Sequence, residues 1–499
     1  MEAQGREQWG TRVGFILAAV GSAIGLGNIW RFPYMAYENG GGAFLIPYFF
    51  ALLTAGIAIM ILEFGIGHKY RGAAPATFAA INKNWEWLGW LQTLVAFCIS
   101  VYYVVIIGWA ISYFYMSFGQ GWGDDPKGFF FENFLHLTEG PFQLGCLVWP
   151  ILGATLIAWL INWIVLYSGV RRGIEVANKI FMPILFVLVL VMLVRGVTLP
   201  GAAEGLNWLF RPDFSAIWDY RVWADAYGQI FFSLSIAFAI MITYSSYLPK
   251  KSDIVNNAFM TSLINCGFSM LAGIAVFSIL GYMAAEQGKA IQDVAGAGVG
   301  LAFVTFPQAI NLLPAASFFG ALFFLSLTFA GLSSEISINE AVISALMDKY
   351  GWSRKVVATW FCIVGFVISL FFVTGGGLYL LDIVDHFINN FGIVFGGLIE
   401  VILLSWFFNL ESVRKHINAV SDFAAGAWWK FCLQAVTPIV LGYMAIANLI
   451  GDIREPYSGY PVGALIAFGW VVVVGVVVAA FILQASKGKG RMLDSSSNL

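Results

Sequence analysis

Small and polar residues interrupt the first long apolar segment of this 499-residue chain. In "GSAIGLGNIWRFPY", residues 21–34, three glycines, a serine, an asparagine and an arginine stand where a membrane helix should be continuous. Non-helical backbone is tolerated at membrane depth only where it is buried in protein or lines a cavity. Gly21, Gly25 and Gly27 permit unwinding and a close approach of the backbone to a ligand. Amide groups freed at the N-terminus of a half-helix would favour an anion.

A second polar run interrupts a later apolar segment. In "GQIFFSLSIAFAIMITYSSY", residues 228–247, Ser233 and Ser235 break the apolar pattern. If spans 1–5 and 6–10 are repeats, the two interruptions occupy equivalent places, which is typical of a secondary transporter with its site at the bilayer midplane. Small-residue packing between helices could explain either run alone. Two runs in register, one of them beside Arg31, favour the transporter.

The sequence offers no catalytic constellation. It contains no P-loop, nucleotide fingerprint, HExxH or GxSxG motif. The five cysteines are scattered without zinc spacing. The four histidines lie near span ends or in loops and are not expected to cluster: His68, His136, His386 and His416. The chain is therefore not expected to be an enzyme.

Composition places the chain in a membrane. Hydrophobic residues make up 60% of it and charged residues 11%, and the mean hydropathy is +0.81, which no soluble globular domain matches. About 20 apolar residues are needed to cross the hydrocarbon core. By that measure twelve spans are predicted: 11–37, 41–67, 88–118, 146–169, 179–199, 223–247, 257–284, 315–347, 355–374, 380–407, 430–451 and 461–485.

The distribution of Lys and Arg predicts the orientation. With the N-terminus in the cytoplasm, 19 of these residues lie in inner segments and 6 outside, while Arg31 lies within the membrane. The positive-inside rule then places both termini in the cytoplasm. The N-terminal sequence has no signal-peptide pattern, so the first span should be retained. Since the chain also lacks a glycosylation sequon, the expected location is the inner (plasma) membrane of a prokaryote.

Four stretches resemble the neurotransmitter:sodium symporter family, which includes the bacterial leucine transporter. They are "REQWGTRVGFILAAVGSAIGLGNIWRFPYMAYENGGGAFLIPY", "VYYVVIIGW", "WADAYGQIFFSLSIAFAIMITYSSY" and "FAGLSS". The resemblance implies one all-α transporter domain over residues 1–499, with twelve transmembrane helices, of which helices 1 and 6 are broken. Two inverted five-helix repeats, 11–199 and 223–407, would be followed by two additional helices within 430–485. The family's activity is Na⁺-driven symport by alternating access.

The resemblance also implies a substrate site between the two breaks. Three donors would meet the substrate's carboxylate: the N–H groups of Leu26 and Gly27 and the hydroxyl of Tyr103. Three carbonyl groups would lie near its amine: those of Ala23, Phe232 and Ser235. Members that carry monoamines have Asp at the position of Gly25, so glycine here predicts a ligand with its own carboxylate, an amino acid. The pocket wall would consist of Ile99, Tyr103, Phe232, Phe238, Ser334 and Ile338.

Two sodium sites follow from the same resemblance. Na⁺ is a hard cation that prefers oxygen ligands and accepts neutral ones, by the reasoning that applies to other hard cations. The first site would use the substrate's carboxylate with Ala23, Asn28, Ser233 and Asn265. The second would use Gly21, Ile24, Ala330, Ser333 and Ser334. For any one of these side chains alone, an ordinary interhelical hydrogen bond is the simpler explanation; their joint match favours the sites.

Charged residues within the membrane are costly and usually functional. The resemblance assigns Arg31 and Asp385 to an outer gate, with Phe232 as a lid over the substrate. It assigns an inner latch to Arg6, Asp348, Trp9, Ser246 and Tyr247. Glu63 would accept hydrogen bonds from the unwound backbone of the second break. Ala237 stands in that break where glycine gives other members more room.

A chloride site is the last expectation. Chloride-independent bacterial members carry Glu where this chain has Ser269, and the remaining site residues match: Tyr48, Gln229 and Ser233. A bound anion would offset the positive charge of two Na⁺ ions in a low-dielectric interior. Glu335 is a rival source of negative charge. It could neutralise the second Na⁺, bind a cationic part of the substrate, or only form hydrogen bonds within span 8.

The sequence therefore predicts a symporter of a neutral amino acid that depends on Na⁺ and Cl⁻. Two alternatives stay open: a sodium-dependent amino-acid sensor on the same fold, and a transporter of a related small amine that bears a carboxylate. The expected partners are the small-molecule substrate and the lipid bilayer, with no nucleic acid. The sequence does not identify the amino acid or the oligomeric state.

Overall fold

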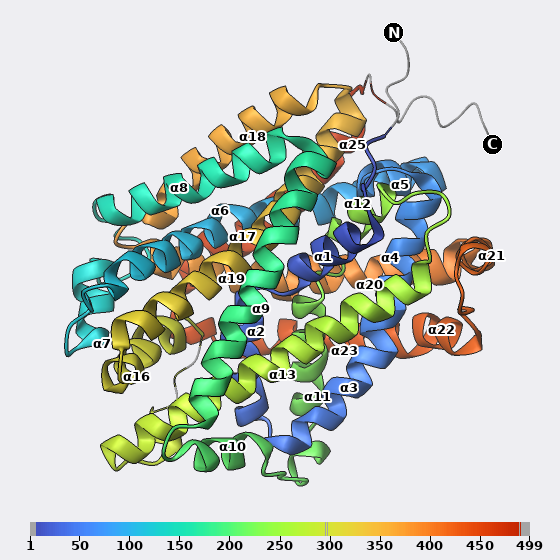
Figure 1. Ribbon diagram of the computed structural model, residues 1–499. Coiled ribbons are helices and arrows are strands. Elements are labelled where there is room, and N and C mark those ends of the chain that lie inside the picture. Colours follow the sequence, from blue (N-terminus) through green and yellow to red (C-terminus); the bar gives the residue numbers. More distant parts are fainter. Residues whose placement is uncertain (1–5, 295, 297, 489, 491–499) are drawn as a thin grey trace.

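The apolar segments form long helices, as their composition predicts. The computed structural model describes residues 6–294, 296, 298–488 and 490, and Figure 1 shows their arrangement. Ten helical stretches of this part are long and apolar enough to cross a membrane. They are Gly42–Tyr70, with α3 (Leu45–Ala51) and α4 (Ile57–Tyr70); Lys83–Ser117, with α6 (Glu86–Ser117); Trp149–Tyr167 (α8); Val170–Val197, with α9 (Glu175–Val197); Ile254–Gln287 (α13); Ala316–Tyr350 (α17); Arg354–Val373, with α18 (Arg354–Ser369); Gly377–Phe407, with α19 (Gly377–Phe387) and α20 (Val394–Ile402); Ala427–Gly459, with α22 (Ala427–Phe431) and α23 (Thr437–Arg454); and Val462–Ala485, with α25 (Val471–Ala485).

Two further spans are broken. α1 (Arg12–Ala23) and α2 (Leu26–Glu38) form a bent pair with an angle of 52°, which makes an eleventh candidate span. α11 (Tyr220–Ser233) and α12 (Ile240–Ser246) flank a break over residues 234–239, and neither is long enough to cross a membrane alone. All twelve predicted segments thus contain helix. The predicted start of the fifth span was wrong, because its helical stretch begins at Val170 rather than at residue 179.

Shorter helices connect the long ones. They are α5 (Ala74–Ile81), α7 (Pro126–Gly128), α10 (Ala202–Phe210), α14 (Ile291–Val294), α15 (Gly298–Gly300), α16 (Phe306–Leu312) and α21 (Leu410–Val420), whereas α24 (Val462–Ala464) is the first turn of the last span. None of them is long enough to span a bilayer.

The first break is formed by extended backbone. α1 starts at a cap in which Thr11 accepts from the Gly14 N–H, and it ends because Ile24 is extended (φ −79°, ψ 102°). Gly25 is also extended (φ −125°, ψ −167°), a conformation open to any residue. Glycine is needed there for space, because a Cβ on Gly25 would lie 2.9 Å from Ser334 Oγ and 3.1 Å from the Tyr103 hydroxyl oxygen.

The second break is formed by left-handed backbone at residues that are not glycine. Ser235, Ala237 and Ala239 have φ values of +53°, +68° and +68°. L-residues rarely adopt this region, and each such residue costs on the order of 1 kcal/mol or more. The surrounding packing must therefore hold the segment in place. Gly397 of α20 contributes to this, since a Cβ there would lie 2.9 Å from the Ala237 methyl group.

Helix packing brings the two breaks together. α1 contacts α12, α13 and α17, and α12 also packs against α4 and α17. α17 lies along α6, which forms the other wall of the same region. At one edge of the molecule α8 and α18 lie side by side (Figure 1). The long helices thus surround the broken ones.

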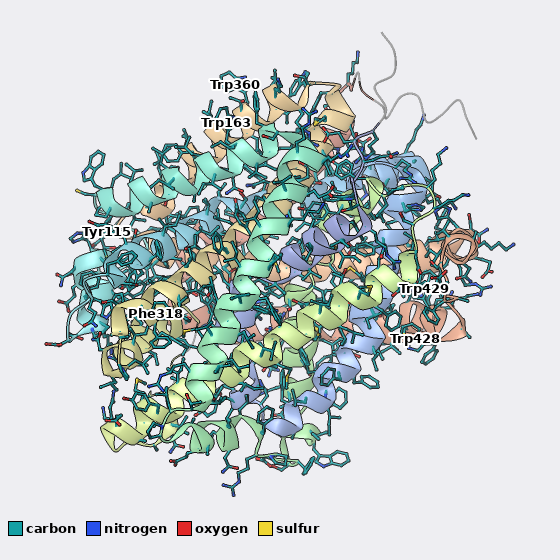
Figure 2. All side chains as sticks on the ribbon, in the orientation of Figure 1. Tyr115, Trp163, Phe318, Trp360, Trp428 and Trp429 are labelled. Atoms are coloured by element: carbon teal, nitrogen blue, oxygen red, sulfur yellow. The ribbon has the colours of Figure 1, made fainter. Side chains whose placement is uncertain are left out.

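The outer surface is rich in large apolar side chains. Tyr115 is 79% exposed and Trp360 63% exposed, and both project from the periphery of the helices in Figure 2. Trp429, which that figure also labels, is by contrast fully buried, and its Nε1–H donates to the Ala58 carbonyl oxygen. An apolar exterior around a core that contains polar groups is expected for a protein that spans a bilayer.

Both described ends of the chain meet the C-terminal end of α17. Arg6 forms an ion pair with Asp348, and Tyr350 and Ser486 are hydrogen-bonded at 2.9 Å. The two ends therefore lie on the same side of the membrane-spanning helices. That this side is cytoplasmic remains the prediction made from Lys and Arg.

The expectation that the histidines do not cluster was wrong. His68 Nδ1 and His416 Nε2 lie 2.9 Å apart, because α21 packs against α4. Burial lowers the pKa of His416, as do the nearby charges of Lys69 and Arg71. The five cysteines are all free thiols.

The buried ion pair between Arg354 of α18 and Glu340 of α17 tests how much the packing of these helices contributes to stability. The Arg354 guanidinium donates to both carboxylate oxygens of Glu340, at 2.6 and 2.7 Å, and Glu340 is fully buried. Arg354→Ala should destabilise the protein by about 3–5 kcal/mol, because it leaves a buried carboxylate uncompensated. Thermal unfolding in detergent measures this, with the exposed Arg172→Ala as the control. Equal unfolding temperatures for the two variants would contradict the predicted contribution of this pair.

Candidate functional site

Residues from both breaks line one small cavity of about 50 Å³ between α6 and α17. All of the predicted substrate contacts are among its lining residues: Ala23, Leu26, Gly27, Ile99, Tyr103, Phe232, Ser235, Phe238, Ser334 and Ile338. Six further residues complete the lining: Ser22, Gly25, Asn28, Tyr102, Ser233 and Asp385. The fold thus brings together residues that are up to 363 positions apart in the chain, from Ser22 to Asp385.

The start of α2 forms part of the cavity lining. The Leu26 N–H points at the Tyr103 hydroxyl oxygen, 3.3 Å away. Gly27 lies against the Phe232 ring, since a Cβ on it would be 2.6 Å from a ring carbon. The backbone amide, the tyrosine hydroxyl and the phenylalanine ring therefore converge on one point. A ligand carboxylate there would face the positive end of the α2 dipole.

A buried polar cluster adjoins the first break. Asn28 accepts from the Gly25 N–H at 2.9 Å. Its amide donates to Asn265 Oδ1 at 2.8 Å, to Ser269 Oγ at 2.7 Å and to Ser233 Oγ at 3.2 Å, and the Asn265 amide also donates to Ser233, at 2.7 Å. The structure thus gathers the side chains predicted for the first sodium site, with the Ala23 backbone at the adjacent cavity wall.

A second group of oxygens joins α1 to α17. Ser334 Oγ lies 3.4, 3.2 and 3.3 Å from the carbonyl oxygens of Gly21, Ser22 and Ile24. The Ser333 hydroxyl donates to the Ala330 carbonyl at 3.0 Å. One hydroxyl hydrogen cannot satisfy three acceptors. The crowding of oxygens around Ser334 therefore fits a site for a cation.

Gln229 has unsatisfied polar atoms beside this region. Both its Oε1 and its Nε2 are buried, and neither has a hydrogen-bond partner among the described residues. The Tyr48 hydroxyl contacts the Cys266 sulfur at 3.3 Å and also approaches Ser269. Buried amide and hydroxyl donors that lack strong acceptors suit a small anion. Tyr48, Gln229, Ser233 and Ser269 are the residues predicted for chloride.

The outer pair is not formed in this structure. The Arg31 guanidinium lies over the Phe232 ring, 4.8 Å from its centroid, and the salt bridges of the described residues do not include it. Asp385 instead accepts hydrogen bonds from Tyr102, at 2.6 Å, and from Asn389, at 2.8 Å. The expected contact between Arg31 and Asp385 is thus absent, because other groups occupy both partners.

The inner network is closed. Both Asp348 oxygens accept from the Arg6 guanidinium, at 2.8 and 2.7 Å, and Ser246 accepts from the same group at 2.8 Å. Arg6 also lies 4.7 Å from the centroid of the Tyr247 ring, and Trp9 Nε1–H donates to the Tyr244 carbonyl at 2.8 Å. Burial alone would lower the pKa of Arg6, but the carboxylate of Asp348 raises it. The predicted latch residues therefore meet.

Two buried glutamates lie beside the site. Glu63 accepts from the Ala237 N–H of the second break at 2.6 Å, which is the contact that the sequence predicts. Glu335 accepts from Ser100 of α6 at 2.7 Å and from Asn339 of its own helix at 3.0 Å. It does not line the cavity. Of the three roles considered for Glu335, the contact to a cationic part of the substrate has no geometric support.

Sequence reasoning missed four residues near the site. Ser22 bonds through its carbonyl to Ser235 at 2.9 Å and through its hydroxyl to Ser337 at 2.7 Å. Tyr102 binds Asp385, Asp225 lies within electrostatic reach of Arg31, and Glu340 binds Arg354. Asp225 and Glu340 could have been found from the sequence, because charged residues within apolar segments usually have a function. Ser22 and Tyr102 gave no such signal.

Comparisons with known proteins agree with this arrangement. Residues 6–125 and 120–488 match the sequence profile described as "Sodium:neurotransmitter symporter family". An uncharacterized sodium-dependent transporter of Methanocaldococcus jannaschii is 46% identical over 97% of this chain and 98% of its own length. A sodium- and chloride-dependent taurine transporter of Canis lupus familiaris is 32% identical over 94% and 83%. A sodium-dependent dopamine transporter of Caenorhabditis elegans is 31% identical over 91% and 82%.

These matches cover nearly the whole chain, and they include both breaks and the residues that line the cavity. The chain belongs to the sodium:neurotransmitter symporter family and is a sodium-dependent membrane transporter.

Proposed function

We propose that this transporter carries a neutral amino acid together with Na⁺ and Cl⁻ by alternating access. The observation that carries the proposal is the meeting of two helix breaks around one cavity. Carbonyl and hydroxyl oxygens from both breaks and from α17 surround it, and the Leu26 amide at the start of α2 donates to the Tyr103 hydroxyl. The oxygens could bind a hard cation, and the amide could bind a carboxylate beside it.

The two sodium ions would occupy the two oxygen clusters. At the first, Asn28, Ser233 and Asn265 would turn their oxygens toward an ion that the substrate's carboxylate also touches. At the second, the ion would lie between Ser334 and the carbonyls of Gly21 and Ile24. The shared carboxylate couples the substrate to the first ion, and the second ion ties α1 to α17.

The amino-acid assignment rests on Gly25 and on the amides that follow it. Any side chain at position 25 would enter the space between Ser334 and Tyr103, where the carboxylate is expected. The chain supplies no acidic group there, so the ligand must bring its own negative charge. Ile99, Phe238 and Ile338 give the rest of the wall an apolar character, which favours a neutral side chain of the substrate.

Alternating access would use the two charged networks in turn. In this structure the inner network is closed and the outer pair is apart. We expect the outer pair to close over Phe232 when the substrate is bound, and the inner network then to open. Relative movement of the two five-helix repeats, 11–199 and 223–407, would drive the exchange.

Counterflow uptake tests the proposal. Purified protein in liposomes loaded with each of the twenty amino acids should accumulate labelled substrate for at least one neutral amino acid, with Na⁺ and not with choline. Binding of an amino acid with Na⁺ but without uptake would identify the sensor alternative instead. Uptake that is independent of Na⁺ would contradict the proposal. Protein-free liposomes supply the baseline.

Removal of single oxygen ligands should weaken Na⁺ binding. Asn28→Ala and Ser334→Ala are each expected to raise the Na⁺ concentration for half-maximal uptake by about tenfold or more, since a hydrogen bond or similar contact to a charged group contributes about 1.5–3 kcal/mol. Ser326→Ala is the matched control, because this buried serine of α17 donates only to the Leu322 carbonyl. Unchanged Na⁺ dependence in both site variants would refute the assignment of the two clusters.

Blocking the substrate's carboxylate should weaken recognition strongly. The carboxamide of the transported amino acid is expected to compete at least about tenfold more weakly for uptake, because it loses the charge that faces the Leu26 amide and the first Na⁺. Tyr103→Phe should weaken competition by the amino acid and leave the carboxamide unchanged. Equal competition by acid and amide would show that Gly25 has another role.

Ser269 should determine whether uptake depends on chloride. With Cl⁻ replaced by gluconate on both sides, wild-type uptake is expected to fall, because Ser269, unlike a glutamate at that position, supplies no negative charge to offset that of the two Na⁺ ions. In Ser269→Glu the dependence should disappear, while Ser269→Ala keeps it or loses activity altogether. Full wild-type uptake in gluconate would contradict a chloride requirement.

A further inference from the structure

A row of polar side chains runs along α13 inside the protein. Asn257, Thr261, Asn265 and Ser269 follow one another at spacings of four residues, and all four are fully buried. Consecutive members of such a row lie on one face of a helix. At a rise of about 1.5 Å per residue the row extends over about 18 Å, which is more than half of the roughly 30 Å hydrocarbon core.

The two ends of the row have different surroundings. At one end, Ser269 and Asn265 accept hydrogen bonds from the amide of Asn28, at 2.7 and 2.8 Å, and Ser269 belongs to the proposed chloride site. At the other end, Asn257 Oδ1 accepts from the Arg12 guanidinium of α1 at 3.1 Å. Arg12 is exposed and lies on the side of the molecule where both described chain ends are found. The row therefore reaches from a buried site to the protein surface.

The middle of the row has hydroxyl groups without partners. Thr261 Oγ1 and the Oγ of the adjacent Ser262 are buried and have no hydrogen-bond partner among the described residues. A serine or threonine hydroxyl inside a helix can donate to the carbonyl four residues earlier, as Thr93 of α6 does to Gly89. Thr261 and Ser262 do not, so both hydroxyls can still donate to another acceptor.

The amide of Asn257 provides a further donor. Because its Oδ1 accepts from Arg12, the amide is oriented with its NH₂ group away from that guanidinium. Asn257 Nδ2 is buried, and it too lacks a partner in the described part of the chain. Unpaired buried donors are uncommon and suit a ligand that accepts hydrogen bonds. Two hydroxyls and one NH₂ group of this kind lie between the surface and the chloride site.

The charge along the row favours an anion over Na⁺. Arg12 is positive, and the NH₂ group of Asn257 presents hydrogens rather than a lone pair. The N-terminal end of α13, at Ile254, adds the positive end of a helix dipole. Na⁺ would be repelled at this end of the row, whereas Cl⁻ would be attracted.

The acidic residues at this end are occupied elsewhere. Glu175 of α9 forms an ion pair with Lys179, and Asp253 caps α13 by accepting from the Asn256 N–H. Within the described residues, neither carboxylate forms a salt bridge with Arg12. The positive charge of Arg12 can therefore act on an ion in the row.

We propose that this row is the route by which Cl⁻ leaves its site toward the side of the chain ends. The inference rests on the proposed function, since it concerns the chloride site. The ion would pass from Ser269 to the hydroxyls of Ser262 and Thr261 and then to the amide of Asn257, and Arg12 would draw it outward. No covalent bond changes, because each donor only replaces part of the ion's hydration shell.

The route is closed in this structure. α1 packs against α13, and the row is fully buried. α1 begins at Arg12, directly after the closed network that contains Arg6 and Trp9. When that network opens, a movement of α1 away from α13 would admit water to the row. Release of Cl⁻ is thereby confined to the state in which the inner network is open.

Efflux of radioactive chloride tests the route. Liposomes that contain the purified protein are loaded with labelled NaCl, and the amino acid identified by counterflow uptake is present on both sides. Thr261→Val keeps the shape of the side chain and removes its hydroxyl. We expect efflux of labelled Cl⁻ to be about tenfold slower in this variant, since a hydrogen bond to a charged group contributes a factor of about this size or more. Thr261→Ser should restore most of the wild-type rate.

A residue of the route should affect the rate of release and not the affinity of the site. Affinity is measured in detergent, as the Cl⁻ concentration, with gluconate as the replacement, that gives half of the chloride-dependent binding of radioactive Na⁺. This concentration should be the same in Thr261→Val and in wild type. Thr93→Val is the matched control, because the Thr93 hydroxyl is buried and donates to its own helix. Wild-type efflux in Thr261→Val, or slow efflux with an equal loss of Cl⁻ affinity, would overturn the proposal.

Arg12 allows a second test at an exposed position, where a substitution should not disturb folding. Arg12→Glu should slow the efflux of labelled Cl⁻ and leave the Cl⁻ affinity unchanged, because the reversed charge repels the anion at the mouth of the route. The control is Arg172→Glu, which changes an exposed arginine outside the row. Equal efflux from the Arg12→Glu and Arg172→Glu variants would contradict the role of Arg12.

The wild-type protein separates this proposal from the proposed function. Na⁺ binding and uptake that do not depend on Cl⁻, without efflux of labelled Cl⁻ through the protein, would contradict the chloride site and with it the route. Efflux in wild type that is unchanged in both Thr261→Val and Arg12→Glu would refute the route alone.

Discussion

Every backbone amide and carbonyl buried in a bilayer needs a partner, and the rest of this structure depends on how that constraint is met at two helix breaks. At Ile24 and Gly25, and again at residues 234–239, the intrahelical hydrogen bonds stop. Side chains from distant helices take their place: Ser334 reaches the carbonyls of α1, and Glu63 accepts from the amide of Ala237. Because these partners are few and some are shared, the breaks retain capacity to bind ions and a ligand.

The same need for partners explains the contacts of three buried acidic residues of α17. Burial in a low-dielectric interior makes each acid dependent on a nearby donor or cation. Glu340 has Arg354, Asp348 has Arg6, and Glu335 has hydroxyl and amide groups only. Those with permanent cationic partners form fixed or latch-like contacts at the end of α17.

Much of this arrangement could be predicted from the sequence because it follows from local sequence patterns. Apolar stretches located the spans, and small or polar residues within them located both breaks. The family resemblance then supplied the lining of the cavity. Three features could not be read in this way. The use of left-handed backbone at Ser235, Ala237 and Ala239 depends on packing against α4 and α20. The separation of Arg31 from Asp385 depends on the competing contacts of Phe232 and Tyr102. The contact of His68 with His416 depends on how α21 folds back, and no local pattern encodes it.

The central claim is that the broken backbone of α1 and α2, together with α17, holds sodium ions. Cryo-electron microscopy of the protein in NaCl and in choline chloride, at a resolution that reveals bound ions, tests this most directly. The account predicts density in NaCl between Ser334 Oγ and the carbonyl oxygens of Gly21 and Ile24, and its loss in choline. Identical maps in the two salts, with the Ser334 hydroxyl still in contact with those carbonyls, would contradict it.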